Sequence, residues 1–473
     1  MVFSANIENF ALLFVYSKIL LYICSPKYAD MWIYFLMIRI AALFGHRKSR
    51  LIIKGQREVA KQTAAPLMWS ESQAQRDVYP SGAENSERPI WFHAASVGEF
   101  EQARPIIEKL RQERPHEKIL LTFFSPSGYE LRKNYGLVDK VLYLPFATPR
   151  RVKKFLNAAQ PKMAIFVKYE FWPAYLKEIH KRGIPLYSVS AIFRPNQLFF
   201  KPWGKWYLRL LGNFDCIFVQ DEASKSLLEN ALGALKGSDK KSGAAKPEIV
   251  VSGDTRFDRV VRIASGTPFL SGAETQTNAV ANPLRLVEQF VEGCGKVLVA
   301  GSTWPQDEAL LAQYVAARPD VKFVLVPHEI DSKHLHYIFN LFEGRMMYYS
   351  ETRNYMPTGV RVLVIDTIGM LSSIYRYGHV AYIGGGFGVG IHNTIEAAVY
   401  GMPVIFGPHY ERFREAKDLI RVGAAASVKT YPQLETVLDN AFARHEEMGK
   451  KALEYVESEL GATERIYNAI IGA

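Results

Sequence analysis

The stretch "WFHAASVGEF", residues 91–100, places a glutamate after an apolar run and a small, turn-prone Ser-Val-Gly step. The apolar run predicts a buried β-strand, and the residues after the step predict the start of a helix. Open α/β sheets place their chemistry at the carboxyl ends of their strands, which is where Glu99 is expected to lie. The sequence therefore predicts either a catalytic carboxylate here or an acid that stabilises a helix start through the macrodipole.

From residue 89 onward, apolar β-branched runs alternate with amphipathic helical segments. This alternation is typical of βαβ units and of parallel sheets. The simplest interpretation is an α/β fold with two Rossmann-like sheets. The other predicted strands lie at 118–124, 163–169, 185–193, 216–221 and 248–254, and then at 296–303, 322–328, 361–366, 380–386 and 403–408.

Length and composition agree with two domains, because 473 residues exceed what one hydrophobic core usually serves and 48% of them are hydrophobic. A tract rich in Ser, Gly, Thr and Ala between the two groups of strands predicts a linker. We predict an apolar and basic N-terminal segment at 1–57, a first Rossmann-like domain at 58–262, a linker at 263–281 and a second Rossmann-like domain with C-terminal helices at 282–473. A polar tract at 233–248 predicts a surface loop within the first domain.

The formal net charge of +11 predicts an anionic partner, which could be nucleic acid, an acidic membrane surface or a phosphorylated substrate. No RRM, KH or helix-turn-helix signature is present, which argues against nucleic acid. The three cysteines, Cys24, Cys216 and Cys294, are scattered and form no CxxC pair. This pattern argues against a disulfide framework or a zinc site and favours a reducing compartment, so the body of the protein is predicted to be cytoplasmic.

Two apolar runs stand near the N-terminus, at 10–23 and 31–44. Each is shorter than the ~20 residues that span a bilayer, and the first lacks the features of a signal peptide. The basic cluster "HRKSR" at 46–50, followed by Lys54 and Arg57, resembles a cytoplasmic flank on an anionic leaflet. We expect a membrane-associating segment, with a pair of buried core helices as the alternative. Whether it spans the bilayer or lies on it, and whether Met31 is the true start, are left open.

The most specific segment is "GGGFGVGIHNTIEAAVYGMPVIFGPHYERFREA" at 384–416. A strand that ends in glycines lets backbone N–H groups approach an anionic ligand, so the segment predicts a phosphate cradle. Its glycine spacing fits neither the dinucleotide fingerprint nor a P-loop. Helical spacing from His392 would put Glu396 one turn along on the same face, where it could bind a ribose diol.

At this point the chain resembles the 3-deoxy-D-manno-octulosonic acid (Kdo) transferases of lipid A assembly, which are GT-B glycosyltransferases. The resemblance covers about residue 31 to the C-terminus. It rests on the glycine-rich segment above and on "HAASVGE" (93–99), "EFWP" (170–173), "SAIFRPNQ" (190–197), "FVQDEAS" (218–224), "GDTRFD" (253–258), "AGSTWPQDE" (300–308) and "DTIG" (366–369).

The resemblance implies two Rossmann-like domains that face a cleft, and transfer of Kdo from CMP-Kdo to a hydroxyl of a phosphorylated lipid A precursor (lipid IVA). It implies that Glu99 is the general base of an inverting displacement. A carboxylate is already ionised at pH 7 and can take the proton of a sugar hydroxyl, and a single inverting step needs one carboxylate rather than a pair. The resemblance also implies that the transfer takes place at the cytoplasmic face of the bacterial inner membrane.

The same resemblance assigns two groups of ligand-binding residues. The donor-binding group is Ser302, Thr303, Gly385, Gly386, His392, Asn393 and Glu396, with Glu396 on the CMP ribose. The group that binds the acceptor or its anions is Ser96, Lys168, Arg194 and Arg256, in which the cations suit the donor's phosphate and carboxylate. The chain departs from the common family pattern at Ala147, Lys168, Tyr169, 326–330 and Met370.

No cofactor and no catalytic metal are expected, because the sequence has no D-x-D pair and no His/Cys ligand cluster. Two alternatives stay open. One is a GT-B transferase that uses a UDP-sugar on a membrane acceptor. The other is a basic, non-catalytic membrane-binding protein. The number of Kdo residues transferred, the acylation of the acceptor and the oligomeric state are not decided by the sequence.

Overall fold

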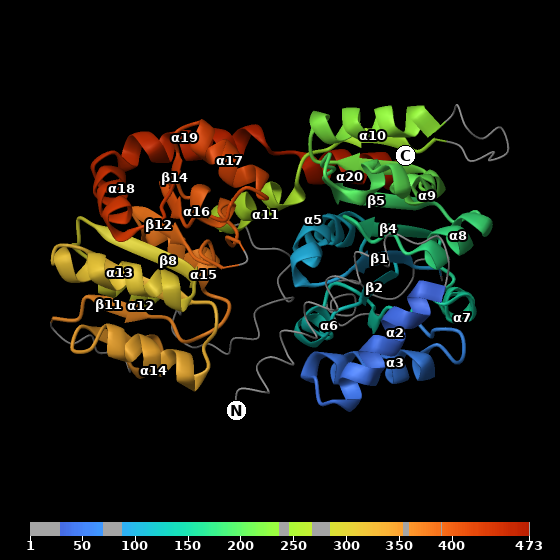
Figure 1. The fold of residues 1–473 in the computed structure, drawn as a ribbon, viewed down its shortest axis with the longest axis horizontal. Coiled ribbons are helices and arrows are strands. Elements are labelled where there is room, and N and C mark those ends of the chain that lie inside the picture. Colours follow the sequence, from blue (N-terminus) through green and yellow to red (C-terminus); the bar gives the residue numbers. More distant parts are fainter. Residues whose placement is uncertain are drawn as a thin grey trace. The chain divides into compact units, whose positions relative to one another are not determined.

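The computed structural model describes residues 29–69, 88–235, 246–266, 284–352, 359–388 and 390–472. Its contacts divide these residues into two compact units (Figure 1). Unit 1 holds the described residues up to Arg256 and those from Gly461 onward, and unit 2 holds those from Phe257 to Leu460. The predicted first apolar run at 10–23, and most of the tracts at 233–248 and 263–281, lie outside the described residues.

Unit 1 is built on a seven-stranded parallel sheet with the order β3-β2-β1-β4-β5-β6-β7. All five residues of β1 are buried, as expected for a parallel sheet that is covered on both faces. The strands are β1 (Ile90–Ala94), β2 (Ile119–Phe123), β3 (Lys140–Tyr143), β4 (Met163–Val167), β5 (Leu186–Ala191), β6 (Cys216–Val219) and β7 (Glu248–Val251).

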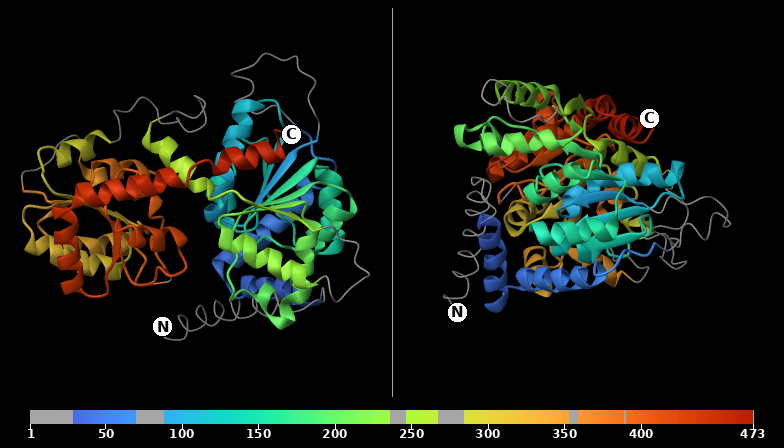
Figure 2. Two further views of the ribbon diagram at one scale, coloured as in Figure 1. Left: turned by 90° about the horizontal axis from the view of Figure 1, so that it is seen from above. Right: turned by 90° about the vertical axis from the view of Figure 1, so that its right-hand side faces the viewer.

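Helices cover both faces of the unit 1 sheet (Figures 1 and 2). They are α2 (Ala29–Leu43), α3 (Arg47–Gln62), α5 (Val97–Glu113), α6 (Pro126–Arg132), α7 (Pro149–Ala159), α8 (Pro173–Lys181), α9 (Lys205–Leu210), α10 (Glu222–Leu235) and α20 (Ala462–Ile470), and α11 (Thr255–Ala264) leads into unit 2.

Unit 2 repeats the architecture with the order β10-β11-β9-β8-β12-β13-β14, again all parallel. Its strands are β8 (Val297–Thr303), β9 (Lys322–Pro327), β10 (Met346–Tyr348), β11 (Val362–Val364), β12 (Val380–Ile383), β13 (Val404–Phe406) and β14 (Ala425–Ser427). Its helices are α12 (Arg285–Val291), α13 (Pro305–Ala317), α14 (Ser332–Leu341), α15 (Leu371–Ile374), α16 (Ile395–Ala398), α17 (Arg414–Arg421), α18 (Tyr431–Ala443) and α19 (His445–Ser458).

The strand order reverses at one place in each sheet, between β1 and β4 in unit 1 and between β8 and β12 in unit 2. Open α/β sheets bind ligands outside the carboxyl ends of the strands at such a switch point. Glu99 follows β1 and Lys168 follows β4, while Ser302 ends β8 and Gly385 follows β12. The predicted site residues therefore lie at the two topological switch points.

Both predicted outer boundaries differ from the structure. Residue 57 falls inside α3, which is part of unit 1: a Cβ on Gly55 would lie 2.4 Å from the Tyr143 ring, and Gln56 Nε2 donates to Leu144 O at 2.8 Å. At the other end, α20 was predicted in the second domain but belongs to unit 1, where Lys109 of α5 pairs with Glu464 at 2.8 Å. Unit 1 therefore contains both ends of the described chain.

The second apolar run forms α2, and its partly buried face joins the core of unit 1. Phe35 and Ile38 are buried, and the Phe35 ring stacks on Phe146 with centroids 4.0 Å apart. None of the described helices combines the length and the apolar composition needed to cross a bilayer.

Candidate active site

Glu99 lies in the first turn of α5, directly after the carboxyl end of β1. Its Oε2 accepts a hydrogen bond from the hydroxyl of Ser96, the residue that precedes the helix. Its Oε1 lies 3.9 Å from Lys168 Nζ, and about a quarter of each of these two side chains is exposed (25% and 26%). The carboxylate is held by two partners but stays open to solvent, so it could accept a proton from an incoming hydroxyl.

Lys168 reaches Glu99 from a left-handed backbone position. Its φ is +57°, which residues with a Cβ rarely adopt. The strand β5 holds it there, because its N–H donates to Val189 O at 2.9 Å and its carbonyl accepts from Ser188 Oγ at 3.2 Å. Ser302 has the same kind of conformation, with φ of +54°, at the end of β8. Strain of this kind persists where the surrounding structure enforces it, as it commonly does at ligand sites.

Asp254 and Arg256 form an ion pair after β7, at the same edge of the sheet. Arg256 Nη2 and Nε lie 2.7 and 2.9 Å from Asp254 Oδ2, which also accepts from Gln220 Nε2 at 3.1 Å. Burial alone would raise the pKa of Asp254, but the charge and hydrogen bonds of Arg256 and the charge of Lys168 outweigh it, so the pKa is lowered. Arg256 is thus oriented by a carboxylate that the sequence analysis missed, although it quoted the "GDTRFD" motif.

His93 and Glu170 form a second buried contact that the sequence analysis did not assign. His93 is fully buried in β1, and its Nε2 lies 3.1 Å from Glu170 Oε2. The same oxygen accepts from Trp172 Nε1 at 2.7 Å, while His93 Nδ1 faces Thr122 Oγ1 at 2.9 Å. These contacts tie the segment after β4 to β1 and β2, and so they support the backbone that carries Lys168.

Arg194 is placed at this edge by β5, which pairs with β4. Its backbone N–H donates to Gln197 Oε1 at 2.8 Å, which fixes the turn that follows the strand. The structure therefore brings Ser96, Glu99 and Lys168 into one cluster. Arg256 adjoins this cluster through Asp254, and Arg194 lies at the same sheet edge.

In unit 2, Ser302 and Thr303 end β8 as predicted, but their side chains differ in role. Thr303 is fully buried, and its Oγ1 donates to Glu308 Oε1 at 2.8 Å. Glu308 is buried too, which raises its pKa, and its Oε2 lies 2.9 Å from His334 Nε2. The Thr303 hydroxyl therefore anchors α13 instead of facing a ligand as the sequence predicted, whereas Ser302 remains partly exposed.

Asp307 ties the glycine-rich loop to the start of α13. Its Oδ2 accepts from the N–H groups of Gly385 and Trp304 at 2.9 and 3.0 Å, and its Oδ1 accepts from Tyr382 Oη at 2.8 Å. Burial raises the pKa of Asp307. The N–H of Gly385 is therefore occupied by a protein carboxylate, and a Cβ on Gly386 would lie 2.6 Å from Gly407 N. At these two positions the structure shows close backbone packing, and the predicted contact with an anion stays a prediction.

The prediction that His392 and Glu396 share a helical face is wrong, because α16 begins only at Ile395. His392 instead stacks on His328 with centroids 4.4 Å apart, and its Nε2 accepts from Trp304 Nε1 at 3.3 Å. Burial, and then the neighbouring His328, lower the pKa of His392 to about 4, so the ring is neutral at pH 7. The rings of Trp304, His328 and His392 thus join the loops that follow β8, β9 and β12.

Glu396 is positioned by Asn393, whose Nδ2 donates to Glu396 Oε1 at 2.8 Å and whose Oδ1 accepts from Ile395 N at 3.3 Å. Tyr375 lies close by: burial, and then the charge of Glu396, raise its pKa. Glu396 itself is partly exposed. Two of the predicted donor residues, Asn393 and Glu396, are thus joined by a hydrogen bond, and a ligand could reach the Glu396 carboxylate.

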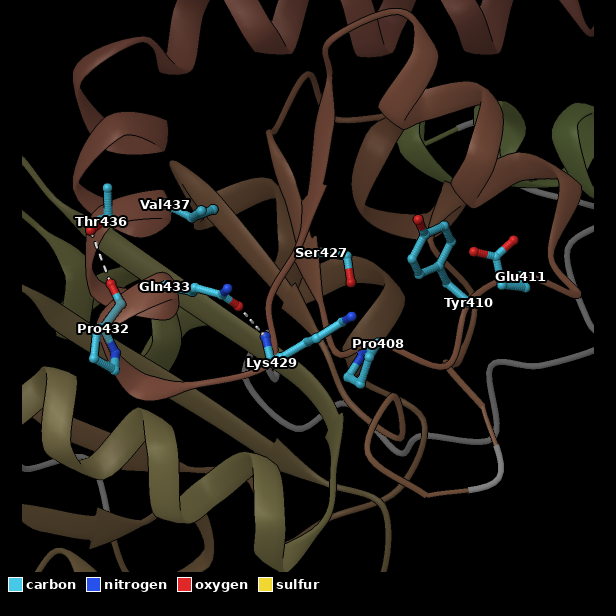
Figure 3. Close-up of a pocket in the computed structure, with 9 residues that line it drawn as sticks. All are labelled: Pro408, Tyr410, Glu411, Ser427, Lys429, Pro432, Gln433, Thr436 and Val437. Atoms are coloured by element: carbon cyan, nitrogen blue, oxygen red, sulfur yellow. Dashed lines mark hydrogen bonds between the residues drawn. The ribbon is translucent and has the colours of Figure 1, made fainter.

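A cavity of about 640 Å³ lies beside the ends of β13 and β14 (Figure 3). Lys429 extends toward Pro408 and Ser427 in this view, and Lys429 N donates to Gln433 Oε1 at 2.9 Å. The volume is typical of a small-molecule site. None of the predicted donor residues lines it, and the sequence analysis did not assign Lys429. Its lining residues are Pro408, Tyr410, Glu411, Ser427, Lys429, Pro432, Gln433, Thr436 and Val437.

Two parallel α/β sheets, each with polar groups gathered at its switch point, define the GT-B fold of glycosyltransferases. The solved structure of UDP-GlcNAc 2-epimerase from Neisseria meningitidis bound to UDP-GlcNAc shares this fold, with a TM-score of 0.55, 15% identity, and coverage of 81% of this chain and 100% of that one.

Sequence comparison shows which proteins the chain is similar to. Residues 69–259 match the family described as 3-Deoxy-D-manno-octulosonic-acid transferase (kdotransferase). The 3-deoxy-D-manno-octulosonic acid transferase of Bordetella pertussis is 28% identical over 81% of this chain and 86% of its own length, and that of Haemophilus influenzae is 25% identical over 80% and 86%. The chain is thus similar to Kdo transferases over about four fifths of its length, which confirms the resemblance and supports a glycosyltransferase.

Proposed function

We propose that this glycosyltransferase moves Kdo from CMP-Kdo to a hydroxyl of lipid IVA, with Glu99 as the general base. The observation that carries the proposal is the cluster of Glu99, Ser96 and Lys168 at the switch point of unit 1. The acceptor hydroxyl attacks the anomeric carbon of Kdo, the bond from that carbon to the CMP phosphate breaks, and Glu99 takes the hydroxyl proton. The ammonium of Lys168 lies 3.9 Å from Oε1 of this carboxylate, whereas the Ser96 hydroxyl donates to Oε2.

The cations around Glu99 suit the charges of the two substrates. A donor with a phosphate and a carboxylate, and an acceptor with two phosphates, need positive partners. Guanidinium groups bind such oxyanions in a fixed geometry. Arg256 is oriented by Asp254, and we propose that it and Arg194 bind substrate anions. In unit 2 we propose that Glu396 and Asn393 bind the CMP ribose and that Ser302 lies beside the donor.

The decisive experiment incubates the full chain with CMP-Kdo and lipid IVA, and follows the acceptor by mass spectrometry. A mass increment of one or more Kdo residues is expected, and it should persist in the presence of a metal chelator. A parallel reaction with UDP-GlcNAc tests the alternative of a UDP-sugar transferase. Absence of any Kdo increment, under conditions where a relative from another bacterium is active, would refute the proposal.

Glu396→Ala should weaken binding of CMP before it affects any later step. A lost hydrogen bond from a ribose hydroxyl to a charged group is worth about 1.5–3 kcal/mol, which corresponds to about 10-fold or more in Kd. Calorimetric titration with CMP measures the change. Glu454→Ala, at an exposed position of α19, is the matched control, and unchanged CMP affinity in the Glu396 variant would remove Glu396 from the donor site.

We also propose that the protein works at the anionic cytoplasmic face of the inner membrane, where a lipid acceptor is found. Three apolar side chains on α2 and directly after it support this: Leu36, Leu43 and Phe44 are 54%, 82% and 85% exposed. Exposed apolar groups beside a basic helix bind anionic bilayers through two additive effects. The packing of α2 and α3 on unit 1 makes them part of the folded domain, so point substitutions test this better than deletions.

A further inference from the structure

A cavity of about 650 Å³ lies among α2, α3 and α7, away from the predicted site residues, and its lining carries five cationic side chains and no acidic one. The cations come from all three helices, whose arrangement is seen in Figures 1 and 2. They are Arg39 from α2, Arg50, Lys54 and Arg57 from α3, and Arg151 from α7. Side chains so far apart in sequence meet only because the fold brings the three helices together.

Arg151 is fixed in place. Its Nη1 donates to Gln56 Oε1 at 3.2 Å, and its guanidinium lies 5.5 Å from the centroid of the Phe146 ring. Gln56 is itself buried and bonded to the backbone, since the same oxygen accepts from Phe146 N at 2.8 Å and its Nε2 donates to Leu144 O at 2.8 Å. Burial, and then the charge of Arg39, lower the pKa of Arg151. This arginine is therefore preorganised, and no carboxylate among the described residues pairs with it.

The other four cations are similarly uncompensated. Arg50 Nε donates to Ala42 O at 3.1 Å, which is a neutral partner. Within the described parts of the chain, none of the five forms an ion pair with a carboxylate, and Arg39, Lys54 and Arg57 are exposed. Five like charges around one cavity repel one another unless an anion enters. A phosphate, which accepts bidentate hydrogen bonds from guanidinium groups, matches this lining.

Exposed apolar side chains also border the cavity. Leu43 lines it and is 82% exposed, and the adjacent Phe44 is 85% exposed. Apolar side chains of this size are costly to leave in water and are favourable in the acyl region of a bilayer. The combination of a cationic cavity and an apolar edge fits a ligand with a phosphate head and hydrocarbon chains better than it fits a soluble phosphate.

We propose that this cavity binds the headgroup phosphate of an anionic membrane phospholipid, with Leu43 and Phe44 inserted beside its acyl chains. The inference deepens the membrane part of the proposed function, but it does not depend on Kdo transfer. It assigns to Arg151 a role in lipid recognition distinct from that of the cations beside Glu99.

The test is co-sedimentation of the full chain with vesicles of phosphatidylcholine, with and without phosphatidylglycerol, and without acceptor or donor. Binding should require phosphatidylglycerol. Lys54→Gln combined with Arg57→Gln should lower the partition coefficient about 10- to 30-fold, since each basic residue near an anionic surface contributes about 1 kcal/mol, or about fivefold. Lys333→Gln combined with Lys450→Gln, two exposed lysines on α14 and α19 of unit 2, removes the same charge and should have little effect.

The variant Ala60→Trp distinguishes lipid binding in the cavity from binding by diffuse surface charge. Ala60 lines the cavity and is exposed, so an indole there should fill the cavity while all five cations remain. We expect this variant to lose most of its preference for phosphatidylglycerol, with an unchanged melting temperature. Full retention of vesicle binding would refute lipid binding in the cavity and would indicate that diffuse surface charge holds the protein on the membrane.

Two further outcomes would also overturn the proposal. Inorganic phosphate at millimolar concentration that displaces the protein from vesicles would indicate a site for soluble phosphate. Normal vesicle binding by the glutamine variants, together with a raised KM for lipid IVA, would assign the cavity to the acceptor's own phosphate. The vesicle readouts need no Kdo transfer, so they stay informative if transfer is not observed.

Discussion

Replacing Glu99 with glutamine is expected to abolish sugar transfer while CMP-Kdo binding persists. The amide has the size of the carboxylate, and its oxygen can still accept from the Ser96 hydroxyl, but it cannot take a proton from the acceptor. Removal of a general base typically costs about 10²- to 10⁴-fold in rate. Initial rates with CMP-Kdo and lipid IVA, together with calorimetric titration of the donor, measure the two effects separately.

The matched control is Glu113→Gln, at the far end of the same helix, where the carboxylate only pairs with Lys109 at 2.7 Å. This variant should transfer Kdo at the normal rate. Near-normal turnover by Glu99→Gln would show instead that Glu99 is an acidic residue at a helix start. If Glu99→Gln lowers donor affinity and rate equally, the substitution disturbs the fold and its effect is not specific to proton transfer.

The buried strands could be predicted from the sequence because a parallel sheet covered on both faces needs continuous apolar runs. The strands that were not predicted, β3, β10 and β14, lie at sheet edges and have only three or four residues. Short edge strands carry too little periodicity to be distinguished from loops. The first domain boundary was placed inside α3 because the basic residues of that helix suggested a separate segment, whereas its other face packs on Tyr143.

The candidate site was predictable only in part. Glu99 and Lys168 follow strands that the sequence reveals, so topology brings them together. Asp254 and Asp307 were missed because their roles depend on partners distant in sequence, such as Gln102 for Asp254 and Gly385 for Asp307. Hydrogen bonds between segments so far apart leave no local pattern. Helical spacing failed at His392 for the opposite reason, since the local pattern was present but the helix begins later.

The glycine-rich loop carries a steric constraint that its sequence motif does not reveal. Glycine was expected there so that an anion could approach the backbone. In the structure, a Cβ on Gly384 would lie 2.2 Å from Ser302 O and 2.5 Å from Thr303 Cα. Both are backbone atoms of β8, the neighbouring strand, which cannot move aside as a flexible side chain could. The constraint at this glycine is therefore the close approach of two strands at the switch point.

Gly384→Ala should accordingly both destabilise unit 2 and disrupt the donor site. The added methyl must separate the ends of β8 and β12, where Gly384 N donates to Gly301 O at 2.9 Å, and overpacking against rigid backbone costs about 3 kcal/mol or more. In a domain of this size each kcal/mol lowers the melting temperature by about 2–4 °C. Loss of the Ser302 geometry should also weaken CMP binding by at least about tenfold.

Gly388→Ala is the control in the same loop, because its Cβ would meet only Gly385 O, at an ordinary 3.6 Å. If both variants melt and bind CMP alike, the close approach of β8 and β12 does not explain the glycine. If only Gly384→Ala loses stability and donor affinity together, the loop positions the donor through the packing of its backbone.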